Sequence, residues 1–141
     1  MKYNIAFFLS ILMCSCVFTK TYQNRKEDKQ KAEVFVEKFY SFIKDNNYDD
    51  ALPLFNDKNQ KKDEILVMLK SRVNKFGNVK GINLQNSRSK VIERDDIRTG
   101  EYNLTYSVKR EREILLENFK VTSIGDTMKI LSYSFEPQKY K

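Results

Sequence analysis

The sequence predicts an α+β domain, in which three N-terminal helices pack on a curved antiparallel sheet of about four strands. Before Gly77, apolar residues recur every three or four positions, which is the period of an amphipathic helix. After Gly77 the period changes to two, as in strands that bury one face. The links between the predicted strands are short, so consecutive strands should pair in an antiparallel meander. We expect this domain to span residues 29–137 of the 141-residue chain.

Residues that favour helix ends bound the three predicted helices. The first helix should stop at Asn46–Asn47, because asparagine tolerates a positive φ. The second, at about residues 48–55, should be short because Pro53 lacks the backbone N–H that an interior turn needs. The third should run from about residue 60 to Phe76, where Gly77 supplies the C-terminal cap.

The strands are predicted by alternation of apolar and polar residues, at about residues 82–92, 102–108, 115–121 and 128–135. Gly125 and Asp126 favour a hairpin turn between the last two strands. The link at residues 93–100 contains Asp95 and Asp96, flanked by Arg94 and Arg98. We interpret these four side chains as solvated charge pairs rather than as a ligand site.

The first fifteen residues have the parts of a secretory signal peptide. Lys2 precedes an apolar run from Ile5 to Met13, and small residues follow at the boundary. As a helix the run would cover roughly 13 Å at about 1.5 Å per residue. A bilayer core is roughly 30 Å thick, so the run is too short for a conventional transmembrane span.

The end of this segment, Met13-Cys14-Ser15-Cys16, resembles a bacterial lipobox. The resemblance implies cleavage before a lipid-modified cysteine, and Cys16 is the better acceptor because the small residues Cys14 and Ser15 precede it. Residues 16–28 would then form a tether that acyl chains, palmitate among them, hold at a membrane. Its basic residues either approach an anionic surface or only solubilise the linker. No acidic residue follows at positions 17 and 18, which by analogy with lipoprotein sorting favours the outer membrane, facing the periplasm.

A second resemblance covers most of the predicted domain. It is carried by the stretches FVEKFYSFIKDNNYDDALPLF (35–55), FGNVKGINLQ (76–85), EYNLTYSV (101–108) and ENFKVTSIGDTMKILSYSF (117–135). These stretches resemble the nuclear transport factor 2-like (cystatin-like, SnoaL-like) superfamily, and most of all its uncharacterised bacterial lipoproteins. The resemblance implies a concave sheet wrapped on a helix hairpin, a pocket at the open end of this cone, and dimerisation through the sheet.

Enzymes of that superfamily place an acidic base and tyrosine donors in the cone, which implies a candidate ligand pocket here. Its candidate lining residues are Phe39, Tyr40, Tyr102, Tyr106, Glu117, Phe119 and Tyr133. Glu117 is the carboxylate at an evidently inward strand position, so it is the candidate base. The alternative interpretation is that the tyrosines are core packing and that Glu117 faces a polar edge.

Charge and composition limit the chemistry further. The chain has 26 Lys and Arg against 19 Asp and Glu, a formal net charge of +7, and no histidine. Without histidine, and with at most one cysteine in the mature chain, we expect no metal site, no cofactor and no Ser-His or Cys-His pair. Acidic residues interrupt the basic clusters, as Glu111 does between Arg110 and Arg112. We therefore interpret these charges as a solvated face and expect no nucleic-acid partner.

These observations predict a non-catalytic, lipid-anchored envelope protein of a diderm bacterium. Its cone domain would bind a small apolar ligand or an envelope protein, and a homodimer is compatible with the fold. One alternative is an inhibitor or immunity lipoprotein that acts through its sheet face. A less favoured alternative is a weak isomerase- or hydratase-like enzyme, because one fold hosts many functions.

Overall fold

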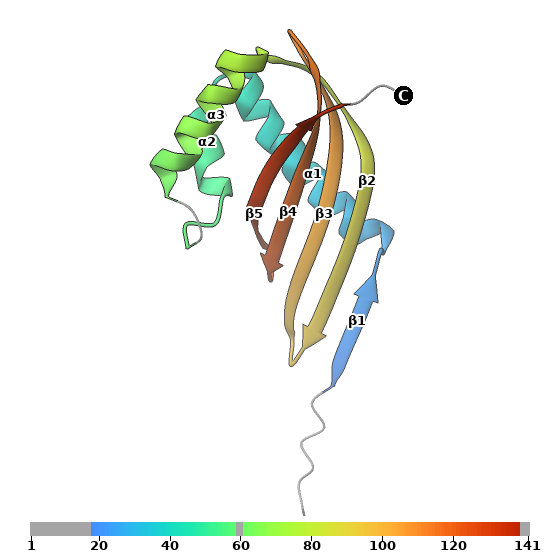
Figure 1. Cartoon of the computed structure of the whole chain (residues 1–141). Helices are drawn as coiled ribbons and strands as arrows, with labels where there is room; N and C mark the ends of the chain where they lie inside the picture. Colours follow the sequence, from blue (N-terminus) through green and yellow to red (C-terminus); the bar gives the residue numbers. More distant parts are fainter. Residues whose placement is uncertain (1–17, 59–60, 139–141) are drawn as a thin grey trace, which may run out of the picture.

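After one short strand, the helices precede four long strands, in the order that the sequence predicts. The computed structural model describes residues 18–58 and 61–138. It contains three α-helices, a short 3-10 helix and a five-stranded antiparallel sheet (Figure 1). The elements are β1 (Thr19–Gln23), α1 (Lys26–Lys44), α2 (Tyr48–Ala51), η1 (Leu52–Leu54), α3 (Lys62–Phe76), β2 (Val79–Arg94), β3 (Ile97–Arg110), β4 (Ile114–Ile124) and β5 (Thr127–Pro137). The α+β class and the three helices are confirmed.

The helix ends follow the predicted local chemistry. Asn46, just after α1, adopts a φ of 55°, and Gly77, just after α3, adopts a φ of 82°. A side chain at Gly77 would also collide with Glu111, so this cap requires glycine for two reasons. The predicted second helix is divided, because Pro53 lies in a 3-10 turn that ends α2.

The sheet is a simple meander in the order β1-β2-β3-β4-β5, with every neighbouring pair antiparallel. The β2–β3 link is shorter than predicted, because both strands extend to a two-residue turn at Asp95–Asp96. Both aspartates have positive φ, 48° and 64°, as the tight hairpin turn requires. The Gly125–Asp126 turn between β4 and β5 is present as predicted.

Strand β1 lies within the segment that the sequence analysis assigned to an irregular tether. Thr19 to Gln23 pair with residues 90–94 of β2, and α1 already begins at Lys26. Four of the five β1 residues are exposed, so this edge strand is held by backbone hydrogen bonds more than by buried side chains. An edge strand of this kind carries no apolar alternation, which is why the prediction gave about four strands instead of five.

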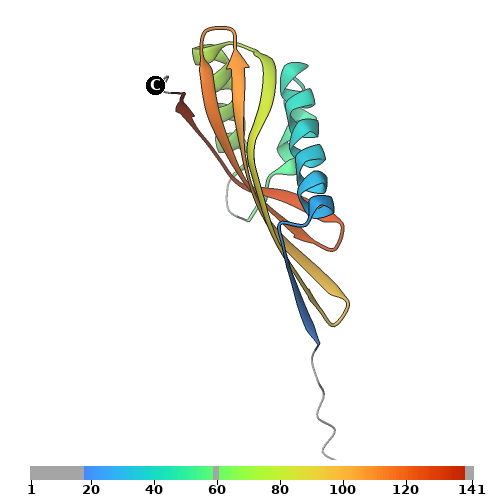
Figure 2. The ribbon, with the colours of Figure 1, turned by 90° about the vertical axis from the view of Figure 1, so that its right-hand side faces the viewer.

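Helix α1 covers one face of the sheet, and the opposite face is open to solvent (Figure 2). The core forms where the apolar stripe of α1, including Val36, Phe39 and Ile43, meets the alternating inward residues of the strands. Residues 1–17 lie outside the described residues, and with them the predicted signal peptide and Cys16. Within the described ranges, no helix combines the length and apolarity that a membrane crossing needs.

Candidate functional site

The predicted base, Glu117, lies at the centre of a buried polar cluster. Its side chain is fully buried and points from β4 toward α1. One carboxylate oxygen, Oε1, accepts hydrogen bonds from Nε and Nη2 of Arg110, at 2.9 and 2.7 Å. The other, Oε2, accepts from the hydroxyl of Tyr40 at 2.9 Å and from that of Tyr133. We call Glu117, Arg110, Tyr40 and Tyr133 the Glu117 cluster.

The pKa shifts of Tyr40, Tyr133 and Arg110 agree with the hydrogen bonds that these side chains donate. Burial, followed by the neighbouring Tyr133 and Glu117, raises the pKa of the Tyr40 hydroxyl well above its ordinary value. Burial and the charge of Glu117 likewise raise the pKa of Tyr133. Burial lowers the pKa of the Arg110 guanidinium, but the attraction of Glu117 outweighs this and raises it overall. Both tyrosines therefore stay protonated and donate, while Arg110 stays charged.

Aromatic rings close the space around the Glu117 cluster. Phe39 meets Tyr40, Phe119 and Tyr133 edge to face, with ring centroids 5.3–5.4 Å apart. Phe119 stacks on Tyr133 at 4.6 Å. Tyr106 is also buried and contacts the rings of Tyr40 and Phe119. Six of the seven predicted pocket residues therefore come together, as part of a closely packed, buried core.

Arg110 is the member of this cluster that the sequence analysis missed. The sequence predicts that it lies in a solvated basic turn, yet it is 3% exposed and its side chain points inward from β3. Its Nη1 also donates to the carbonyl oxygen of Gly77 at 3.2 Å. Its position in the strand could have indicated this burial, since Arg110 continues the alternation of inward side chains after Tyr106 and Val108.

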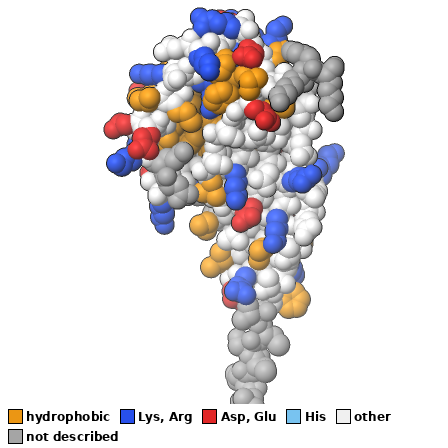
Figure 3. Space-filling view, viewed as in Figure 1, with side chains coloured by type: hydrophobic (Ala, Val, Ile, Leu, Met, Phe, Trp, Pro, Cys, Tyr) orange, Lys and Arg blue, Asp and Glu red, His pale blue; other side chains and the backbone are white. Residues whose placement is uncertain are grey.

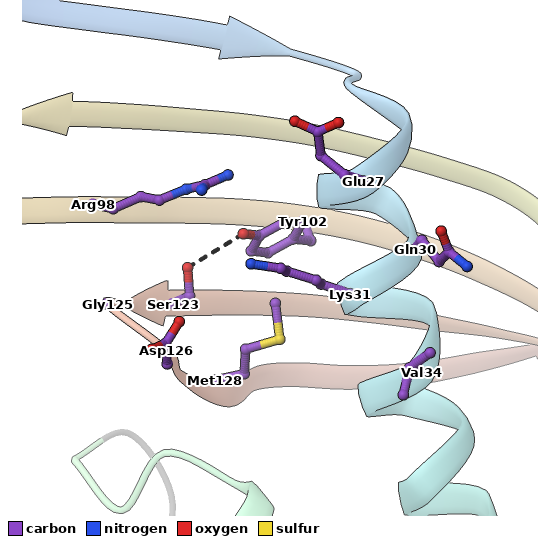
Figure 4. A pocket seen from close by; sticks show the side chains of 10 residues that line it. All are labelled: Glu27, Gln30, Lys31, Val34, Arg98, Tyr102, Ser123, Gly125, Asp126 and Met128. Carbon is purple, nitrogen blue, oxygen red and sulfur yellow. Dashed lines mark hydrogen bonds between the residues drawn. The ribbon is translucent and has the colours of Figure 1, made fainter.

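A pocket lies at the other end of the domain, between the N-terminal half of α1 and the ends of β3, β4 and β5 (Figure 4). Its volume is about 570 Å³. Apolar surface comes from Val34, Met128 and the ring of Tyr102, and polar groups come from Lys31, Arg98, Ser123 and other rim residues. We call it the open-end pocket. Tyr102 is the predicted pocket residue that lines it.

Tyr102 is held in the wall of the open-end pocket by its own strand. Its ring lies over Gly100, where an added Cβ would come within 2.6 Å of the ring. Its hydroxyl lies 3.3 Å from Oγ of Ser123 on β4, and either group can donate (Figure 4). Because position 100 is glycine, the Tyr102 ring can lie over the strand. The ring thereby forms one side of the pocket.

A buried carboxylate ties α1 to the sheet beside the open-end pocket. Asp28 is 1% exposed and accepts hydrogen bonds from Arg25 and from Arg98 of β3. Burial by itself raises the pKa of Asp28, but the hydrogen bond from Arg25 and the charge of Arg98 outweigh it, so the pKa is lowered. The prediction that Arg98 pairs with Asp95 or Asp96 is wrong, because the helix that begins at Lys26 brings Asp28 within its reach.

The face of the sheet opposite α1 is mainly polar. Its central rungs carry Asn, Thr, Ser and charged side chains, as in the row Asn86, Thr105, Asn118 and Ser134. Figure 3 looks onto this face and shows apolar side chains gathered mainly toward α2 and α3. In the described ranges, no group of three or more Asp, Glu, Cys or His side chains could hold a metal ion.

Comparison with known proteins adds little to this geometry. No family model matches the chain, and no curated protein does. Among solved structures, the chain is similar to Bd1075 of Bdellovibrio bacteriovorus, with 14% sequence identity and a TM-score of 0.49. The match covers 79% of this chain and 41% of that one, so this chain spans less than half the length of Bd1075.

Proposed function

We propose that this chain is a non-catalytic, lipid-anchored envelope protein that binds a small, mainly apolar ligand in the open-end pocket. The observation that carries the proposal is the pocket itself. A volume of about 570 Å³ falls in the range of small-molecule sites, which also combine apolar walls with a few polar groups. The order of helices followed by an antiparallel meander also supports the proposed kinship with the nuclear transport factor 2-like superfamily.

The Glu117 cluster supports a non-catalytic function. A general base must reach the proton that it removes, either directly or through one water molecule. Both oxygens of Glu117 are occupied by donors from Arg110, Tyr40 and Tyr133, and aromatic rings cover them. The cluster is therefore enclosed in the core, and an enzymatic function draws no support from it.

The inhibitor alternative also draws less support than ligand binding. A protein-binding sheet face would be expected to expose a contiguous apolar or charged patch of several hundred Å². The central rungs of the face opposite α1 instead mix small polar side chains with both signs of charge. For the same reason, dimerisation through this face has weaker support than the fold resemblance alone suggests.

The ligand proposal can be tested by filling the pocket. Val34 lines the pocket from α1 and is 59% exposed, so Val34→Trp should fold and obstruct the opening. Val67 on α3 is 67% exposed and lies away from the pocket, so Val67→Trp is the matched control. The probe is anilinonaphthalene sulfonate, whose rings suit the apolar wall and whose sulfonate suits Lys31. We expect Val34→Trp to weaken binding about tenfold and Val67→Trp to leave it unchanged. Equal affinities in both variants would contradict the proposal.

A further inference from the structure

The start of β1 lies at the tip of the longest hairpin in the described chain. Thr19 pairs with Arg94, the last residue of β2, and Arg94 pairs with Ile97, the first residue of β3. Thr19, Arg94 and Ile97 therefore form one rung, next to the Asp95–Asp96 turn. Figure 1 shows this end projecting beyond the β4–β5 hairpin and beyond all helices.

Covalent geometry places the predicted lipid close to this end. Cys16 precedes Phe18 by two residues. A residue spans at most about 3.6 Å, so the Cα atom of Cys16 lies within about 7 Å of that of Phe18. If Cys16 carries the lipid, only positions 17 and 18 separate it from β1, because β1 and the start of α1 take up eight of the thirteen residues expected to form the tether.

The same end exposes apolar side chains. Phe18 is 72% exposed and Ile97 is 60% exposed. Ile97 also lines a shallow hollow of about 430 Å³ on the face opposite α1, together with Ile92 and the threonines of the neighbouring rungs. Exposed aromatic and aliphatic groups beside an anchor are suited to the boundary between lipid headgroups and acyl chains. Figure 3 shows apolar side chains near the start of β1.

The charged side chains at this end do not favour binding to an anionic membrane. Its basic residues, Lys20, Arg94 and Arg98, are matched by three acidic ones, Glu93, Asp95 and Asp96. These charges give no net attraction to an anionic bilayer, because the acidic groups oppose the attraction of the basic ones. Any contact must therefore come from the anchor and the apolar side chains.

We propose that the β2–β3 tip, defined as Phe18, Thr19 and residues 94–97, rests on the phospholipid surface and holds the domain upright on the membrane. This inference rests on the lipid anchor of the proposed function. The long strands then point away from the bilayer. Residue 109, on the same strand and the same face as Ile97, lies twelve positions along β3, which is about 40 Å at 3.3 Å per residue.

The test uses the lipidated full chain in phosphatidylcholine vesicles that contain a nitroxide-labelled lipid as quencher. A fluorophore is attached at Ile97→Cys in one variant and at Lys109→Cys in the other, since both side chains are exposed. We expect vesicle flotation of both variants and several-fold stronger quenching at position 97, unchanged by high salt. Equal quenching of floating protein at the two positions, or stronger quenching at 109, would overturn the proposal, as would quenching at 97 that disappears in high salt.

The anchor is tested separately in the same assay. Cys16→Ser should stop flotation, because Phe18 and Ile97 alone are too few to hold the domain on a bilayer. Flotation of Cys16→Ser would contradict the lipid anchor, whatever the quenching pattern. Failure of the anchor and failure of the upright orientation are thus distinguishable.

Discussion

The Glu117 cluster and the open-end pocket lie between the same helix and the same sheet, yet one is closed and the other is open. In the cluster, large aromatic side chains of α1, β4 and β5 face one another, and every oxygen of Glu117 has a donor. At the open end, α1 presents Gln30, Lys31 and Val34, and the strands present Tyr102, Ser123 and Met128. The polar residues most suggestive of catalysis are therefore enclosed in the core, whereas the pocket is lined by residues that carry no catalytic pattern.

Breaking the buried ion pair of the Glu117 cluster should lower the free energy of unfolding more than any other substitution considered below. Glu117→Gln keeps the shape of the side chain but leaves the guanidinium of Arg110 buried without a counterion. We expect the free energy of unfolding to fall by about 3–5 kcal/mol. Urea denaturation measures this loss.

Replacing both partners of that pair is the control. The double variant Arg110→Met with Glu117→Met removes the unpaired charge as well as the pair, so it should be more stable than Glu117→Gln. A Glu117→Gln variant as stable as the original chain would show that the cluster is not an ion-paired core.

A smaller difference in stability should distinguish substitutions of two neighbouring buried tyrosines, Tyr40 and Tyr106. Tyr40 and Tyr106 are each 1% exposed and their rings contact each other, but only the Tyr40 hydroxyl has a hydrogen-bond partner among the described residues. Tyr40→Phe should lower the free energy of unfolding by about 2 kcal/mol, because the lost acceptor is charged. Tyr106→Phe should cost nothing or stabilise, since it removes a buried hydroxyl without a partner. Equal losses in thermal or urea denaturation would be the contrary result.

The smallest effect concerns the ion pairs beside the open-end pocket. Asp28→Asn should lower the free energy of unfolding by about 1 kcal/mol near neutral pH, because Arg25 and Arg98 are partly exposed to solvent. The folded pKa of Asp28 lies below its ordinary value of 3.8, so this stabilisation is present above that pH and is lost as the pH falls through the folded pKa.

The pH dependence provides the measurement for Asp28. Urea denaturation at a series of pH values should show a constant difference between the original chain and Asp28→Asn above about pH 5, narrowing below about pH 4. A difference that widens on acidification would reverse the sign of the expected linkage and contradict the paired carboxylate.

Local sequence patterns predicted most of the helices and strands and much of the core. The change of apolar period at Gly77 separated helices from strands, and Asn46, Pro53 and Gly125 marked ends and turns where the structure has them. These features depend on residues near one another in the chain, so a single sequence reveals them. The edge strand β1 was missed because its residues are mostly exposed and bury no apolar face.

The sequence alone was enough to predict an α+β domain whose consecutive strands pair in a meander, but it left open whether Glu117 faces inward or toward a polar edge. Which candidate residues line a pocket became apparent from the packing of helix against sheet. Glu117 meets Arg110 across the two strands of a hairpin and Tyr40 from a helix 77 positions away, while Asp28 meets Arg98 over 70 positions. Such contacts depend on how helix and sheet pack in space, and no periodicity along the chain records that packing.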